Sequence, residues 1–459
     1  MSKYMGKVMY EGSKMKEITT FSPTGILGYG FPEESLKNAQ GFDIDVIACD
    51  GGSTDQGPNY LGQGKFLADR EMVKRDLRLL LKARDEEDIP LLISTSGGSG
   101  SKEHLDKTVN IAKDIAKEEG LKFTLSKIYT DVKKSLLKEK LKKDEIRKLD
   151  YDKELSERDI DQAKRVVCQM GAEPYIEAIE RGADVVLGGR SVDPAPFAAI
   201  PLKEGFDKGL TFHLGVLLEC GAIAAKPGSG ADSLIGILRK DHFEVVPPNP
   251  KRICTVETIA DHTLYEKADP YLIQMPNGEV NVSNSEFEQV GEGTVRIKGT
   301  TFKEKPYSLL IEGVEKVGYR TIAPAGIRDP ILISKIESVL QGVKEEVRDI
   351  ADEGKYNLIF RKYGIDAVLK IKEEHRCNEI GIIIDVTGET QEIADSICSM
   401  ARSTLLHYGF EGRMTTAGNL AFPFSPSDIS VGEVYSFSIH HLLVNVDPME
   451  IARIEMEEV

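Results

Sequence analysis

Residues 48–62 read ACDGGSTDQGPNYLG, and they follow an apolar run that has the pattern of a β-strand. The run stops at Asp50, and a turn rich in glycine and hydroxyl groups begins. A turn that only connects a strand to a helix needs one glycine and an Asp or Asn to close it. This turn also carries a second carboxylate, Asp55. These additional glycines, hydroxyl groups and carboxylates predict a strand–loop–helix unit whose loop holds functional groups.

The same order of strand, glycine-rich loop and helical pattern occurs three more times, over residues 17–39, 89–120 and 183–202. The runs Leu91–Ile93 and Val185–Leu187 are apolar on both faces, which is typical of parallel strands buried between helix layers. Strands that alternate with helices in this way predict a doubly wound α/β domain with a mainly parallel sheet. We assign it to residues 1–246.

The chain changes character twice outside these units. Residues 131–170 are highly charged, have leucines at helical spacing and predict a helical arm that acts as a lid or a subunit contact. The segment PPNPKR, residues 247–252, predicts a domain boundary. Short alternating runs with turns at Asn277-Gly278 and 291–293 follow, and then a helix after Asp329. Residues 247–459 are therefore predicted to form an α+β domain.

Composition limits the classes of function. The 459 residues carry a formal net charge of −16 with a pI near 5.2, which is the wrong sign for binding nucleic acid. No apolar run approaches the roughly 20 residues that a membrane helix needs. Six cysteines are scattered without a C-x-x-C pair, and the first residues lack the apolar core of a secretory signal. These features predict a cytoplasmic protein.

In a parallel sheet the loops after the strands gather at one edge, where ligands bind. We expect the loops at 25–30, 50–57, 96–101 and 188–193 to converge there on one cleft. Glycine lets the backbone approach a ligand closely, and free N–H groups at helix starts favour anions. The predicted anion-binding residues are Gly51, Gly52, Ser53, Thr54, Ser96, Gly97, Gly98, Ser99, Gly100, Gly189, Arg190, Ser191 and Asp193. The alternative is that each loop only connects its strand to its helix.

Three residues are candidates for acid–base catalysis: Asp50, Asp55 and His262. His262 lies in a helical pattern with carboxylates one turn away, which an ordinary exposed helix also shows. Arg190 could clamp a substrate carboxylate through two hydrogen bonds, or it could pair with Asp193 and hold its own loop. The spacing of His and acidic residues fits no metal motif, so we expect no tightly bound metal.

Six stretches together resemble the acyclic terpene utilisation (AtuA-type) family. They are residues 48–62 and the motifs GGRSVDPAPFAA, HLGVLLECGA, TVETIADHTLYEKADPY, GYRTIAPAGIRDP and AGNLAFPFSPSDI. The likeness spans residues 16–445. It implies an N-terminal α/β domain, a link to the breakdown of branched acids as acyl-CoA esters, and a small companion domain or protein. It assigns no catalytic residue.

Two hypotheses of function follow. The first is a lyase of the hydratase or dehydratase type, acting on a small anionic hydroxy acid or its acyl-CoA ester. The second is a non-catalytic, ligand-binding subunit of a complex with a small companion protein. A CoA thioester fits the first as substrate, and no other cofactor is indicated. We expect a homo-oligomer that binds neither nucleic acid nor membrane.

Overall fold

The computed structural model describes residues 17–149, 153–265, 269–369 and 377–459. The chain forms two compact units. Unit 1 runs to Val314 and includes Phe437–Val459, and unit 2 is Glu315–Ser436. No helix among the described residues is long and apolar enough to cross a membrane.

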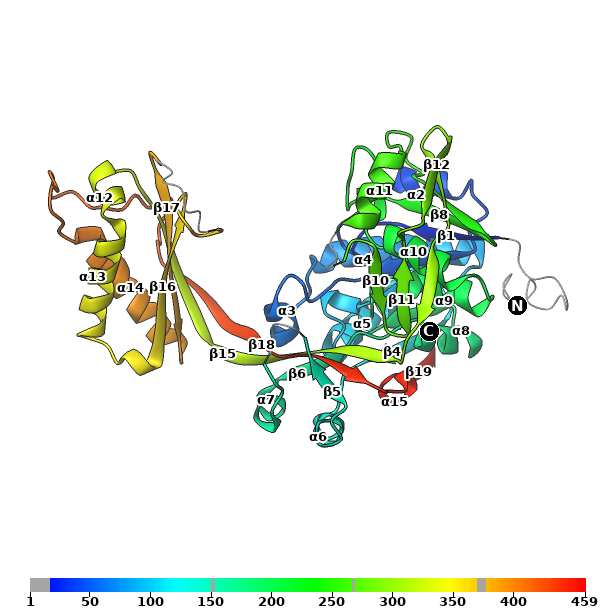
Figure 1. Ribbon diagram of the computed structural model, residues 1–459, viewed down its shortest axis with the longest axis horizontal. Helices are drawn as coiled ribbons and strands as arrows, with labels where there is room; N and C mark the ends of the chain where they lie inside the picture. Colours follow the sequence, from blue (N-terminus) through cyan, green and yellow to red (C-terminus); the bar gives the residue numbers. More distant parts are fainter. Residues whose placement is uncertain (1–16, 150–152, 266–268, 370–376) are drawn as a thin grey trace. The chain divides into compact units, whose positions relative to one another are not determined.

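Unit 1 is built on a ten-stranded sheet with a parallel centre (Figure 1). In spatial order the parallel strands are β1 (Glu17–Ser22), β2 (Val46–Asp50), β3 (Leu91–Ser94), β7 (Val185–Gly188) and β4 (Thr124–Tyr129). The three innermost of the parallel strands, β2, β3 and β7, are buried on both faces because their residues are mostly apolar. Antiparallel strands extend both sides: β8 (Leu234–Arg239), β9 (His242–Val246), β13 (Thr294–Lys298) and β12 (Glu286–Gly291) beyond β1, and β19 (Arg453–Glu458) beyond β4.

Helices cover both faces of this sheet, as the doubly wound prediction requires. Ile47 and Cys49 of β2 point into one apolar cluster, while Val46 of the same strand points into another on the opposite face. The first face is covered by α2 (Glu33–Ala39), α4 (Arg70–Glu87) and α5 (Lys102–Glu119). The second is covered by α8 (Glu173–Glu180), α9 (Ala195–Lys203) and α10 (Lys208–Leu218). The predicted α/β class is confirmed.

The structure does not divide the chain at residue 247, where the sequence predicts a boundary. β13 pairs with β9, and its Val295 and Ile297 pack in the same apolar cluster as Phe243. Residues after 247 therefore complete the first sheet, and the second unit begins only at Glu315. They also form α11 (Val256–Leu264) and a three-stranded sheet of β10 (Leu272–Met275), β11 (Gly278–Asn281) and β14 (Thr301–Glu304).

The segment 131–170 is not a helical arm. It contains α6 (Lys134–Lys142), β5 (Ile146–Lys148), α7 (Glu157–Gln162) and β6 (Arg165–Cys168), and residues 150–152 lie outside the described chain. β5 pairs with β18, and β6 pairs with β15. The charge and the leucine spacing predict a helical arm, but Ile146, Val166 and Cys168 are buried in a core cluster.

Unit 2 packs its helices on one face of a small antiparallel sheet (Figure 1). Its strands are β16 (Tyr356–Tyr363), β17 (Ile380–Gly388) and parts of β15 (Ser308–Ile327) and β18 (Ile429–Val444), which each continue into unit 1. Its helices are α12 (Pro330–Ser334), α13 (Ile336–Arg348) and α14 (Gln391–His407). The remaining helices, both in unit 1, are α3 (Pro58–Gln63) and α15 (Pro448–Ile451).

Candidate functional site

The four glycine-rich loops meet at the carboxyl edge of the parallel strands, as predicted. The Leu27 N–H donates to the Asp50 carbonyl at 2.8 Å, and the Gly51 N–H donates to the Ser94 carbonyl at 2.9 Å. The Arg190 N–H donates to the Gly100 carbonyl at 3.1 Å. Backbone hydrogen bonds therefore join each loop to the next across four neighbouring strands.

Several glycines lie where two loops pack so closely that a side chain would not fit. Gly100 has a φ of +64°, and a Cβ atom there would lie 2.2 Å from the backbone nitrogen of Arg190. A Cβ atom on Gly52 would lie 2.5 Å from the Cα of Gly98. The Gly51, Gly98, Gly100 and Gly189 N–H groups all donate to backbone carbonyls. These groups are thus committed within the protein, which favours the connecting-loop alternative for them.

The predicted hydroxyl groups are placed differently from one another. Ser53 Oγ donates to Asp55 at 2.6 Å, and Ser191 Oγ donates to the Gly189 carbonyl at 3.1 Å. Ser96 and Ser99 are fully buried, and their Oγ atoms have no hydrogen-bond partner in the part of the chain that the structure describes. Gly97 lies between them in a short 3₁₀ turn, Ser96–Gly98. Anion binding by this loop stays a prediction.

Arg190 is a buried ion-pair partner in the structure. Its Nε donates to the Glu312 carboxylate at 2.9 Å, and its Nη1 donates to the Ser191 carbonyl at 3.0 Å and to Asp193 at 3.2 Å. The exposed fractions of the Arg190 and Glu312 side chains are only 2% and 3%. This geometry matches the alternative in which Arg190 holds its own loop, and it extends that alternative by a second carboxylate.

Glu312 gathers donors from three segments. It accepts hydrogen bonds from Thr54 Oγ1 at 2.6 Å and from Gln169 Nε2 at 3.0 Å, in addition to Arg190. Burial alone would raise the pKa of Glu312, but the Arg190 charge and these hydrogen bonds lower it below its ordinary value. Glu312 is therefore a carboxylate that ties the loop at 50–57 to the loop at 188–193.

Asp50 is the last residue of β2, and its carboxylate interacts electrostatically with Asp193 and Arg190 of this network. Its carboxylate accepts from Ser94 Oγ at 2.7 Å and from the Gly52 N–H, and the residue is 5% exposed. Burial, and next the nearby Asp193 carboxylate, raise the pKa of Asp50 to about 8. Arg190 and the two hydrogen bonds only partly oppose that increase. A carboxyl group that holds its proton near neutral pH is characteristic of acid–base sites.

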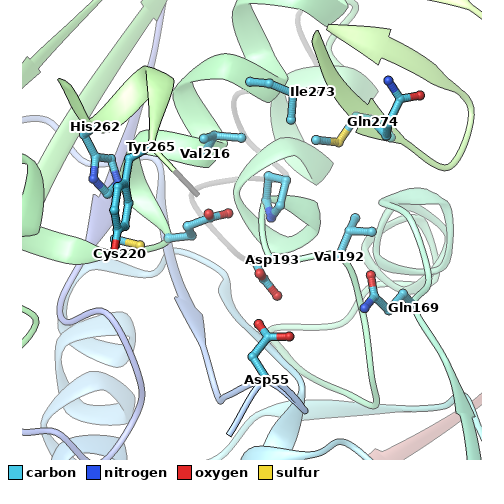
Figure 2. A pocket seen from close by; sticks show the side chains of 13 residues that line it. Asp55, Gln169, Val192, Asp193, Val216, Cys220, His262, Tyr265, Ile273 and Gln274 are labelled. Carbon is cyan, nitrogen blue, oxygen red and sulfur yellow. The ribbon is translucent and has the colours of Figure 1, made fainter. Parts of the chain in front are cut away.

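A pocket of about 240 Å³ opens beside these loops, and Asp55 and Asp193 form one side of it. Figure 2 shows their carboxylates pointing toward one another. Burial raises the pKa of Asp193, and the Asp55 charge adds to the rise, although Arg190 works against it. Glu219 and His262 also line the pocket, with His262 in the last turn of α11. Two predicted acid–base candidates, Asp55 and His262, thus share one pocket with Asp193.

A model of the family described as "Acyclic terpene utilisation family protein AtuA" matches residues 70–226 and 245–427, which is more than half of the chain. The chain belongs to the AtuA family. The match begins at residue 70, so the stretch 48–62 precedes it. No curated protein and no solved structure matches this AtuA-family chain.

Sequence reasoning missed Glu312 and Gln169 in this AtuA-family protein. The only sequence signal for Glu312 is a lone carboxylate within the apolar run Leu309–Val314. His213 is buried between the hydroxyls of Thr300 and Thr263 and does not line the pocket.

Among the described residues, no group of three His, Cys, Asp or Glu side chains is arranged to hold a metal ion. The catalytic and binding roles assigned from the sequence stay predictions.

Proposed function

We propose that this AtuA-family protein is a lyase of the hydratase or dehydratase type, which acts on a small hydroxy acid or its acyl-CoA ester. One observation carries the proposal: two carboxylates from different loops point toward one another on one side of a small pocket, and the pKa of one of them is raised. Pairs of acids whose surroundings separate their pKa values can divide the roles of acid and base.

The proposed chemistry assigns a step to each group. For dehydration of a 3-hydroxyacyl substrate, Asp193 in its protonated form donates a proton to the hydroxyl group, and the C–O bond breaks to release water. Asp55 or His262 takes the proton from the carbon next to the carbonyl, and that C–H electron pair forms the double bond. Hydration is the reverse. General acid–base catalysis of this kind contributes roughly 10² to 10⁴ in rate.

The charge of the pocket limits the range of possible substrates. Asp55, Asp193 and Glu219 line it, and no Lys or Arg is among the described residues that do. Arg190, the cation expected to hold a substrate carboxylate, already pairs with Glu312 and Asp193. A free carboxylate would enter against like charges, whereas the carbonyl of a thioester is neutral. We therefore favour an acyl-CoA ester over a free hydroxy acid.

The test is an assay with a short 3-hydroxyacyl-CoA and the matching 2-enoyl-CoA, followed by the ultraviolet absorbance of the unsaturated thioester. We expect turnover by the wild type, and a loss of at least a hundredfold in Asp55→Asn and Asp193→Asn. Asp69→Asn is the matched control, because Asp69 caps α4 at an exposed position and Asn caps a helix about as well as Asp. Binding of the thioesters without turnover would refute the proposal and favour the ligand-binding subunit.

A further inference from the structure

A second cavity of about 450 Å³ adjoins the acidic pocket in unit 1. The two cavities share four wall residues, Gln169, Val192, Gln274 and Met275. Figure 2 shows Gln169, Val192 and Gln274 on one side of the acidic pocket, with His262 and Tyr265 on the other. The second cavity, which we call the apolar chamber, therefore adjoins the acidic pocket along these four residues.

The chamber differs from the acidic pocket in its chemistry. Leu149, Pro306, Leu310, Leu442 and Val444 make up most of the remaining wall, and none of the described residues that line it is a carboxylate. Lys305 is the one charged side chain among them. Binding sites for organic molecules usually have such a mainly apolar wall with a few fixed polar groups.

Hydrogen bonds hold the two glutamines of the shared wall. The Gln169 amide donates to Glu312, so the shared wall is tied to the buried Arg190 ion pair. The Gln274 amide donates to Glu279 at 2.7 Å, and its oxygen accepts from Lys305 at 3.1 Å. Both amides are positioned before any ligand enters, which reduces the ordering cost of binding.

From these observations we infer that the apolar chamber binds an apolar arm of the substrate while the polar end reacts in the acidic pocket. The inference rests on the proposed function only for naming the occupant as substrate. The acidic pocket, at about 240 Å³, is about half the size of the chamber, at about 450 Å³, so the chamber has more room for a long apolar group. The substrate class is thus a small hydroxylated or thioester end joined to an alkyl chain.

The test uses a property of the composition: the chain has no tryptophan. Leu442→Trp places the chain's single tryptophan in the chamber wall at a half-buried position. Leu136→Trp is the matched control, because Leu136 is also half-buried but lines a different cavity. The probes are 1-alkanols from butanol to octanol, which carry an alkyl chain and a neutral hydroxyl group and do not depend on turnover.

We expect the tryptophan emission of Leu442→Trp to shift to shorter wavelength when an alkanol binds. The alkanol concentration at the midpoint of this shift should fall about fourfold per added methylene, the equivalent of ~0.8 kcal/mol per buried CH₂. Adding Val444→Phe, which narrows the chamber, should weaken the binding of octanol more than the binding of butanol. A midpoint independent of chain length, or an equal response from Leu136→Trp, overturns the inference. If 3-hydroxyacyl-CoA esters are not turned over while the alkanol result holds, the proposed function fails and the chamber stands.

Discussion

Glu312→Gln is the substitution that most directly tests the buried network of the site. The Glu312 and Arg190 side chains are 3% and 2% exposed, and Glu312 also accepts from Thr54 and Gln169. Glutamine has one acceptor oxygen where the carboxylate has two, and it leaves the Arg190 charge without its buried counter-ion. Breaking a buried pair by removing one partner costs about 3–5 kcal/mol. We expect unit 1 to lose that much unfolding free energy at pH 7.

The assay should report on unit 1 alone, since a chain with two compact units need not unfold in one step. Urea unfolding of Leu442→Trp, followed by tryptophan fluorescence, meets that need because residue 442 lies in unit 1. The control is Glu304→Gln in the same background. Glu304 pairs with Lys208 at the surface, and exposed pairs contribute about 0–1 kcal/mol.

The pH dependence provides an independent check. The pKa of Glu312 is lowered in the folded protein, so its stabilising contribution is complete above its unfolded value of about 4.3 and is lost as the pH falls through the folded pKa. The difference between wild type and Glu312→Gln should therefore be full at pH 6 and shrink below pH 4. A loss at pH 7 no larger than that of Glu304→Gln would show that the network does not hold the loops.

Three further predictions concern the same loops. The folded pKa of Asp50 is raised, so wild-type stability should fall as the pH rises from about 4 toward about 8, and Asp50→Asn should flatten that fall; melting temperatures at pH 5 and pH 9 test this. Gly100→Ala should destabilise by several kcal/mol more than Gly182→Ala, because both glycines have positive φ but only Gly100 meets backbone within 4 Å; urea unfolding compares them. If Asp193 is the general acid, turnover should decline as the pH rises through its raised pKa, and a pH–rate profile without that alkaline decline contradicts the assignment.

The parallel centre of the sheet was predictable because its signals are local. Runs such as Leu91–Ile93 and Val185–Leu187 are apolar on both faces and stand directly before glycine-rich loops. The antiparallel extension was not predictable, because β13 pairs with β9 about 50 residues away and alternation alone does not name a partner strand. The same reason explains segment 131–170, whose short strands pair with β15 and β18.

Part of the candidate site could also be predicted from the sequence. Asp55 and Asp193 stand out in the sequence because polar groups follow apolar strands, and the carboxyl-edge rule for parallel sheets places their loops together. His262 lies in α11, so that rule does not account for its place in the same pocket. Glu312 could not be found in this way, since it lies 122 residues from Arg190 in a strand of different topology. Its role depends on a tertiary contact that no spacing encodes.

The excess of glycine in residues 48–62 has a physical explanation in the crowding of acids. Loops that touch backbone to backbone bring Asp50, Asp55 and Asp193 closer together than bulkier loops would allow. Burial, with the neighbouring carboxylates adding to it, raises the pKa of Asp50 and Asp193, which is unfavourable for folding wherever both must ionise. Arg190 limits that cost by pairing with Asp193, and Glu312 in turn fixes Arg190. The glycines thus allow the acids to lie close together, and the buried Arg190 opposes the resulting rise in their pKa values.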